Sequence, residues 1–286
     1  MEIVRTEAEL RERVRAWKAA GERVGFVPTM GALHDGHLAL VRHARSLAPR
    51  VVASVFVNPT QFGPSEDFSR YPRQPEKDAQ LLAGAGCDLL FLPDVATIYP
   101  PGSSTFVEVE GPSQGLEGEL RPGHFRGVAT VVTALFGLVQ PDVAVFGEKD
   151  AQQLAVVRRL VRDLHLPVEV VGHPIVREAD GLAMSSRNAY LSPEEHRAAL
   201  VLARGLRAAE RAVLTGERRS AALLERVRET VAAEPGVELQ YAAVVDADSF
   251  QPVSNLDSGS YVLPIAARVG ETRLLDNLQV RRAGEN

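Results

Sequence analysis

The sequence predicts an α/β fold, in which a Rossmann-like parallel sheet with helices on both faces precedes a smaller C-terminal α+β domain. Through the first two thirds of the 286 residues, short and almost wholly apolar segments alternate with amphipathic segments of helical period. Parallel strands that are buried on both faces have this pattern. After about Arg177 the order changes to two long helix-like segments followed by strand-like segments. We therefore predict a first domain over residues 1–176 and a second over residues 177–286.

The first predicted element is an amphipathic helix from Thr6 to Ala20, in which Thr6 and Glu9 have the spacing of a capping box. The remaining elements of the first domain alternate. Strands are expected at 23–29, 51–57, 88–93, 142–147 and 167–176, and helices at 37–47, 75–85, 126–139 and 150–163. In the second domain, helices are expected at 193–215 and 220–233, and strands at 237–247, 260–270 and 272–280.

Composition narrows the classes of function. The formal net charge of −5 argues against a surface that binds nucleic acid. The N-terminal segment lacks the apolar run of a signal peptide, and the longest apolar run, residues 128–139, is too short to span a membrane. The single cysteine, Cys87, excludes an internal disulfide and is expected to be a small buried residue. These features predict a cytoplasmic protein with no nucleic-acid or membrane partner.

Two histidines, His34 and His37, flank a glycine where the first predicted strand gives way to a helix. A helix N-terminus offers unpaired N–H groups and partial positive charge to a phosphate. Residues three apart share a helix face, so both rings could point at one anion. In the alternative, His34 only caps the helix and His37 is a half-buried residue of the fold. The chain has neither the P-loop pattern nor the G-x-G-x-x-G pattern.

Three further polar segments follow apolar ones, and in parallel sheets ligands bind beyond the carboxyl ends of the strands. Asn58 and Gln61 carry amides that suit a hydroxyl-bearing ligand, although ordinary turn chemistry explains them equally well. The segment GEKDAQQ contains Lys149, one of only three lysines, and a lysine is a compact phosphate-binding charge. The segment MSSRN, residues 184–188, has the composition of a phosphate-binding loop or of a surface linker.

Taken in order, the segments PTMGALHDGH, NPTQF, YPR, RPGHF, GEKD and MSSRN resemble the pantothenate synthetase (pantoate–β-alanine ligase) family, from about Val24 to Leu191. The resemblance implies a wider kinship with nucleotidyltransferases that carry a His-x-Gly-His motif. The resemblance implies a ligase that forms pantoyl adenylate from ATP and pantoate and releases pyrophosphate. β-Alanine then displaces AMP to give pantothenate. A homodimer that uses Mg²⁺ with ATP is also implied. The C-terminal third carries no comparable motif.

The resemblance also implies roles for the polar residues. ATP would be bound by Met30, His34, His37, Gly147, Lys149, Asp150, Val176, Met184, Ser185, Ser186 and Arg187, of which His34, His37 and Lys149 would be catalytic. Gln61 and Gln153 would hold pantoate, and Asn58 and Tyr71 would shape the side on which β-alanine and pyrophosphate bind. Asp78 is expected near the metal. Glu117, Arg121 and His124 are expected in a subunit contact or a lid, the alternative being a structural loop.

Two competing functions stay open at this point. A nucleotidyltransferase that moves AMP or CMP to a phosphorylated acceptor would share the histidine turn and the second phosphate loop, but would not need Gln61 and Gln153. A nucleotide sensor would explain the phosphate loops but not the amides. A full aminoacyl-tRNA synthetase is disfavoured, because the chain is short and acidic. We also expect a hinge near MSSRN, whose closure would exclude water from the acyl adenylate.

Overall fold

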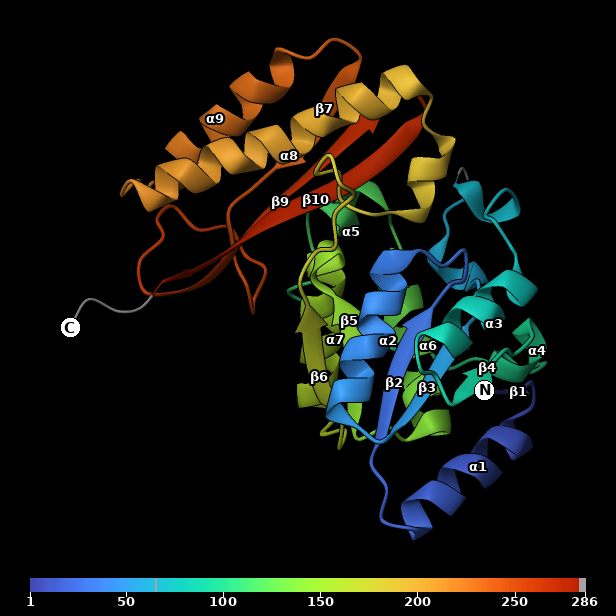
Figure 1. Ribbon diagram of the computed structural model, residues 1–286. Coiled ribbons are helices and arrows are strands. Elements are labelled where there is room, and N and C mark those ends of the chain that lie inside the picture. Colours follow the sequence, from blue (N-terminus) through green and yellow to red (C-terminus); the bar gives the residue numbers. More distant parts are fainter. Residues whose placement is uncertain (65, 283–286) are drawn as a thin grey trace. The chain divides into compact units, whose positions relative to one another are not determined.

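The structure, a computed structural model, describes residues 1–64 and 66–282 and divides the chain into two compact units (Figure 1). The first unit comprises Met1–Glu148 and Val156–Pro174. The second comprises Lys149–Ala155 and the described residues from Ile175 onward. The sequence-based boundary after Val176 stays a prediction. Within the described residues, no helix has both the length and the apolar character needed to cross a bilayer.

A parallel sheet forms the centre of the first unit, as predicted, and it has six strands, one more than the sequence indicated. Its strands are β1 (Glu2–Val4), β2 (Val24–Thr29), β3 (Arg50–Val55), β4 (Leu89–Phe91), β5 (Val143–Gly147) and β6 (Glu169–His173), in the spatial order β1-β4-β3-β2-β5-β6. The chain runs outward from β2 in one direction through β3 and β4, and in the other through β5 and β6. The carboxyl ends of β2 and β5 therefore form a topological switch point, where such sheets bind ligands.

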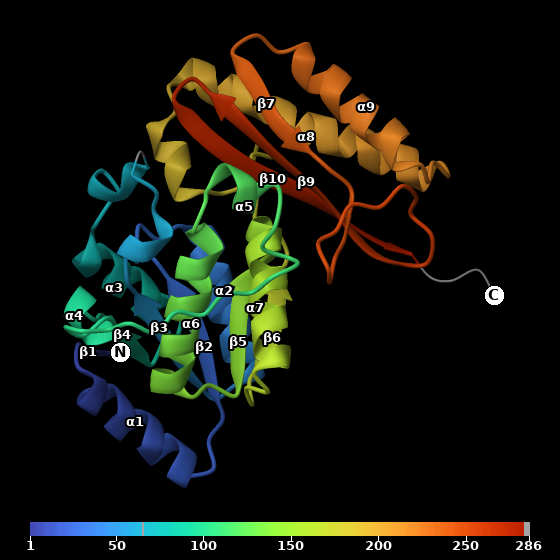
Figure 2. The ribbon, with the colours of Figure 1, turned by 180° about the vertical axis from the view of Figure 1, so that it is seen from behind.

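Helices cover both faces of this sheet. The helices α2 (Asp35–Leu47) and α3 (Pro75–Gly84) lie over one face (Figure 1), and α6 (His124–Val139) lies over the other (Figure 2) with the part of α7 (Ala151–Asp163) that belongs to this unit. The remaining helical segments are α1 (Glu7–Ala19), α4 (Val95–Ile98), α5 (Glu117–Leu120) and the 3-10 turns η1 (Pro59–Gln61), η2 (Asp67–Ser69) and η3 (Glu148–Asp150). The predicted capping box of Thr6 and Glu9 is confirmed at α1.

Apolar side chains fill the space between the sheet and each helical layer. On the α2 and α3 side, the core includes Val41 of α2, Leu82 of α3 and the strand residues Val27 and Leu90. On the other side, Phe136 of α6 packs edge-on against Phe26 of β2, with ring centroids 6.3 Å apart. The strands β2 to β5 are almost wholly buried, which explains why the sequence shows apolar runs there rather than alternation.

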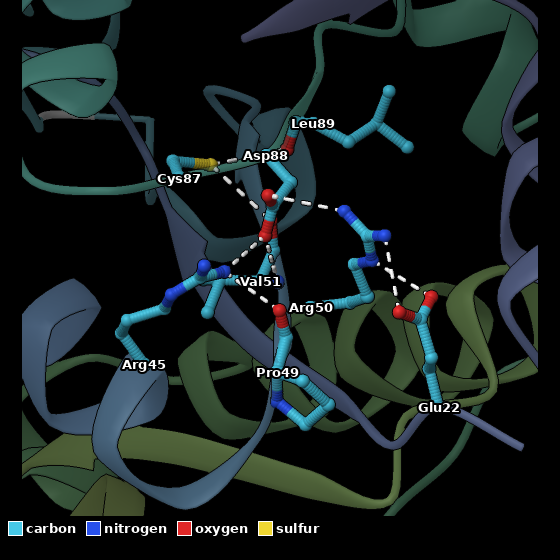
Figure 3. Close-up of polar contacts among 8 residues, drawn as sticks. All are labelled: Glu22, Arg45, Pro49, Arg50, Val51, Cys87, Asp88 and Leu89. Carbon is cyan, nitrogen blue, oxygen red and sulfur yellow. Dashed lines mark hydrogen bonds and ion pairs between the residues drawn. The ribbon is translucent and has the colours of Figure 1, made fainter.

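Charged residues gather at the amino ends of the strands (Figure 3). Asp88, just before β4, accepts hydrogen bonds from the backbone N–H of Val51 at 2.8 Å and from Arg45 Nη1 at 2.7 Å. Arg50 pairs with Asp88 at 3.7 Å and donates two hydrogen bonds to Glu22, at 2.8 and 3.1 Å. This network lies at the amino ends of the strands, whereas the candidate site lies at their carboxyl ends.

The second unit is an α+β module, as predicted. The strands β7 (Val237–Ala242), β8 (Val245–Asp246), β9 (Gly259–Val269) and β10 (Thr272–Arg282) form an antiparallel sheet around β9. The helices α8 (Pro193–Leu214) and α9 (Ser220–Ala232) lie side by side over this sheet in both views (Figures 1 and 2). Leu202, Leu223 and Leu263 join the helices to the sheet in one buried core. The 3-10 turn η4 (Ser186–Tyr190) precedes α8.

Candidate active site

The turn between β2 and α2 has two residues with unusual backbone conformations. Gly31 has φ +81° and Ala32 has φ +51°. A Cβ at Gly31 would lie 2.9 Å from Oδ2 of Asp78, so only glycine fits there. The buried Asp78 carboxylate accepts hydrogen bonds from the backbone N–H groups of Ala32 at 3.0 Å and Leu33 at 2.9 Å. Asp78 thus stabilises the turn through two hydrogen bonds. The expectation that Asp78 lies near a metal stays a prediction.

The two histidines of the motif cap α2 together. His34 is the N-cap residue, and its Nδ1 accepts a hydrogen bond from the backbone N–H of Gly36 at 3.1 Å. Nδ1 of His37 accepts from the backbone N–H of His34 at 3.4 Å, and the ring centroids lie 4.1 Å apart. Because each Nδ1 is an acceptor, the proton of each neutral ring is on Nε2. The pair therefore presents N–H donors at a helix N-terminus, which suits a phosphate.

The two amides after β3 form a second cluster, joined to the histidine turn through Met30. Asn58 and Gln61 are both buried, and Asn58 Nδ2 donates to Gln61 Oε1 at 3.1 Å. Gln61 Nε2 lies 2.9 Å from the sulfur of Met30, which is the first residue of the turn. Tyr99 donates from its hydroxyl to Asn58 Oδ1 at 2.9 Å. Sequence reasoning missed Tyr99, because its contact with Asn58 is tertiary and no local pattern marks it.

The segment from 62 to 73 brings further aromatic and charged residues beside this cluster. The buried ring of Tyr71 packs edge-on against Phe62, with centroids 5.8 Å apart. Glu66 forms hydrogen bonds at 2.8 and 2.7 Å with Arg121, and Arg121 also contacts His124. The RPGHF segment is thus bound to residues of this same unit. Its expected role in a subunit contact or a lid stays a prediction.

The second unit carries the remaining predicted residues in two segments. In the first, which contains Gln153, Lys149 Nζ lies 3.8 Å from Asp150 Oδ1, and Asp150 is exposed. The side-chain amide of Asn277, on β10, donates to the backbone carbonyl of Lys149 at 2.9 Å. Asn277 was not predicted, because 128 residues separate it from Lys149. Gly147, at the end of β5, belongs to the first unit.

The second of these segments, residues 176–190, is a folded loop. Met184 donates its backbone N–H to the carbonyl of Val176 at 3.0 Å. Ser185 caps η4, which includes Ser186, by accepting from the N–H of Arg187 at 3.2 Å. Two sets of contacts that stabilise this loop could not be predicted, because no local sequence pattern marks them. The amide of Asn188 donates to Glu178 at 2.6 Å and to the Ala183 carbonyl at 3.1 Å, and Arg177 forms a two-pronged ion pair with the buried Asp276 at 2.7 and 2.9 Å.

Two other titratable features of the first unit lie outside these clusters. His173, the last residue of β6, has its Nδ1 3.1 Å from Nδ1 of His43 on α2. Burial, and next the nearby His43 ring, lowers the pKa of His173. Cys87 is buried, as predicted, and burial raises the pKa of its thiol to about 12. Such a thiol is a poor nucleophile.

Comparisons with known proteins agree on one family. The sequence model described as "Pantoate-beta-alanine ligase" matches residues 2–279. A pantothenate synthetase of Heliobacterium modesticaldum is 53% identical over 280 residues, which cover 98% of this chain and 99% of that protein. The crystal structure of pantothenate synthetase from Thermus thermophilus has a TM-score of 0.92 at 54% identity, covering 99% of this chain and 100% of that chain.

A further solved structure contains ligands. It is the pantoate–β-alanine ligase of Francisella tularensis complexed with "Beta-gamma ATP and Beta-alanine". It has a TM-score of 0.78 at 33% identity, and the match covers 97% of each chain.

Proposed function

The chain belongs to the pantoate–β-alanine ligase family, and on this premise we propose that it condenses pantoate with β-alanine, using ATP, through a pantoyl adenylate. The observation that carries the proposal is the capping pair of His34 and His37, joined through Met30 to the amides of Asn58 and Gln61. One cluster suits phosphate and the other suits a hydroxy-acid, which a nucleotide sensor would not need.

In the first step, a carboxylate oxygen of pantoate attacks the α-phosphorus of ATP. The bond from this phosphorus to the bridging oxygen breaks, and pyrophosphate leaves with the electron pair. Negative charge grows on the phosphate oxygens, and the Nε2–H groups of His34 and His37 donate to them. The partial positive charge at the start of α2 acts in the same direction. Gln61 and Gln153 hold the pantoate hydroxyl and carboxylate.

In the second step, the amine of β-alanine attacks the acyl carbon of the adenylate. The carbon–oxygen bond to AMP breaks and its electron pair leaves with AMP, the new amide nitrogen loses a proton to water, and pantothenate and AMP are released. Asn58 and Tyr71 shape the side on which β-alanine enters. A carboxylate is a poor acyl donor, so the adenylate supplies the leaving group that this step requires.

The second unit supplies further phosphate ligands in this proposal. Lys149 neutralises phosphate charge. Ser185, Ser186 and Arg187 bind the β- and γ-phosphates, with Met184 beside them. Gly147 and Val176 offer backbone atoms to the nucleotide, and Asp150 contacts the adenosine. The hydrogen bonds of Asn188 to Glu178 and to the Ala183 carbonyl support this assignment, since they help to order the loop that carries these residues.

Magnesium is proposed to accompany ATP. Mg²⁺ keeps several waters and is held by substrate phosphates with one or two carboxylates, rather than by a cage of protein ligands. The chain fits this mode, because the acid expected near the metal, Asp78, is a single carboxylate that lies directly beneath the backbone of the turn before His34. When bound, the ion would neutralise charge on the phosphates. A homodimer and a cytoplasmic location are proposed from family membership alone.

The experiment that tests the function follows both products. Pantoate, β-alanine and ATP are incubated with the protein, and AMP and pantothenate are quantified by chromatography. We expect equal amounts of the two, and neither when any one substrate is omitted. ADP in place of AMP would contradict an adenylate, and transfer of AMP to a phosphorylated acceptor would favour a nucleotidyltransferase.

A further inference from the structure

His124, at the start of α6, is bonded through both nitrogens of its ring. Its side chain is buried, with Nδ1 2.9 Å from the backbone carbonyl oxygen of Gln61 and Nε2 3.1 Å from Nη1 of Arg121. A guanidinium can only donate, so Nε2 must be the acceptor and the ring proton must be on Nδ1. His124 therefore donates its Nδ1–H to Gln61. Burial, and next the charge of Arg121, lowers the pKa of His124 to about 4, so the ring is neutral at pH 7.

Arg121 is itself fixed, so the tautomer of His124 is fixed as well. Nε and Nη2 of Arg121 donate to the two carboxylate oxygens of Glu66 at 2.8 and 2.7 Å. The Glu117 carboxylate lies 3.9 Å from Nη1. The Arg121 side chain is only 14% exposed, and a two-pronged pair of this kind sets the plane of the guanidinium. Nη1 then points at His124, and Nη2 also donates a longer hydrogen bond, of 3.4 Å, to the carbonyl oxygen of Gln61.

The start of α6 also touches the backbone of η1 directly. A Cβ at Gly127 would lie 2.5 Å from the carbonyl oxygen of Thr60 and 2.8 Å from Cα of Gln61, so no larger residue fits. The Gly127 carbonyl accepts from Asn58 Nδ2 at 3.1 Å. The backbone of Gln61 is thus held from α6 by this contact and by the 2.9 Å bond of His124, which is shorter than the 3.4 Å bond of Arg121 to the same carbonyl.

We propose that His124 is a positioning residue for Gln61: its Nδ1–H fixes the Gln61 carbonyl and thereby the direction of the Gln61 amide. Arg121 and Glu66 select the tautomer that makes this bond. The inference rests on the proposed function, in which Gln61 binds pantoate. It assigns to the RPGHF segment a task inside its own unit, the alignment of the hydroxy-acid substrate.

The test separates hydrogen bonding from ring volume. His124→Phe keeps a ring but no hydrogen bond, whereas His124→Asn keeps an N–H near the position of Nδ1. We expect KM for pantoate to rise about tenfold in His124→Phe, with KM for ATP changed by less than about twofold. His124→Asn should recover a large part of this loss. Equal defects in the two variants, or equal rises in KM for ATP and pantoate, would overturn the proposal.

A double-mutant cycle tests whether His124 acts through Gln61. Gln61→Ala alone should raise KM for pantoate, and adding His124→Phe should raise it little further. If the rises in KM for pantoate caused by the two substitutions multiply in the double variant, the inference is overturned while the role of Gln61 stays intact. No effect of Gln61→Ala on KM for pantoate would overturn the pantoate role of Gln61 and the inference with it.

A second variant keeps the test open if His124→Phe does not fold. Arg121→Lys leaves a positive charge but removes the fixed guanidinium, together with its 3.4 Å hydrogen bond to the Gln61 carbonyl, and so releases the tautomer of His124. It should raise KM for pantoate in the same direction as His124→Phe. An unchanged KM for pantoate in Arg121→Lys would contradict the proposed selection of the tautomer.

Discussion

Oδ1 of Asp78 accepts a hydrogen bond from the backbone N–H of Leu33 at 2.9 Å, immediately before the paired histidines. Oδ2 of the same carboxylate accepts from Ala32. This pair of bonds ties α3 to the turn that precedes His34 and His37, so one buried acid links the stability of the fold to the geometry of the proposed phosphate site.

Replacing Asp78 with Asn should therefore impair both folding and catalysis. The buried N–H groups of Ala32 and Leu33 each need an acceptor. Asn offers only one acceptor oxygen, and its NH₂ group would face the second N–H. We expect the free energy of unfolding to fall by about 2–4 kcal/mol and kcat to fall as well. Urea unfolding and steady-state kinetics measure the two effects.

Asp88→Asn is the matched control for this variant. Asp88 also accepts a backbone N–H, that of Val51, but at the amino ends of the strands (Figure 3). Asp88→Asn should lower the free energy of unfolding and leave kcat and the KM values for ATP and pantoate unchanged. A loss of kcat in Asp88→Asn similar to that in Asp78→Asn would show that the activity follows general stability.

The buried His124 should leave a signature in the pH dependence of stability. Its pKa is lowered from 6.5 to about 4, so between these values the unfolded chain binds the proton and the folded protein does not. The free energy of unfolding should therefore fall as the pH drops from about 6.5 towards 4, by about 3 kcal/mol from this group. Above pH 6.5 the group should contribute nothing.

The variant His124→Phe isolates this contribution. Subtracting its pH profile of unfolding free energy from that of the wild type cancels the other titrating groups. A difference that varies between pH 4 and 6.5 is expected. A difference that stays constant over this range would show that the folded ring takes up its proton as readily as the unfolded one.

Cys87 should resist alkylation. With its thiol buried and the pKa raised to about 12, almost no thiolate is present at pH 8. Native protein treated with iodoacetamide should stay unmodified by mass spectrometry, while protein unfolded in guanidinium chloride should gain one adduct. Rapid modification of the native protein would contradict the burial of this residue.

Asn188→Ala should weaken ATP binding without affecting pantoate. The variant removes the bonds to Glu178 and to the Ala183 carbonyl that hold the loop of Ser185 and Arg187. We expect KM for ATP to rise about three- to tenfold, since the loop must then be ordered by the substrate. Initial rates with each substrate varied in turn check this. A rise in KM for pantoate instead would reverse the assignment of the two segments.

Sequence analysis predicted the elements that depend on residues close together in the chain. The capping box of Thr6 and Glu9 and the apolar strands depend on neighbours in the chain, so their patterns are visible without the fold. The strand β1 was missed, because three residues pair with β4 only when the sheet is formed. The helix α6 begins at His124 rather than Arg126, with Gly123 as its N-cap residue in a left-handed conformation.

The chemistry of the site was predicted less completely than the fold. The histidine turn and the amides could be found, since strand ends and polar motifs coincide in the sequence. Their supports could not, because each is a tertiary contact between distant residues. Asp78 is 45 residues from Leu33, and His124 is 63 residues from Gln61. Contacts between residues so far apart in the sequence cannot be inferred from the spacing of residues along the chain.

The most direct test of adenylation at this site is pantoate-dependent exchange of labelled pyrophosphate into ATP, measured without β-alanine. We compare the wild type with His34→Ala, His37→Ala and Lys149→Ala, and with His165→Ala as a control in an exposed turn before β6. We expect exchange in the wild type and the control. In the other three we expect a loss of at least about a hundredfold, roughly 2.7 kcal/mol of transition-state stabilisation. Absence of pantoate-dependent exchange in the wild type, or full exchange in both histidine variants, would contradict adenylation at this site.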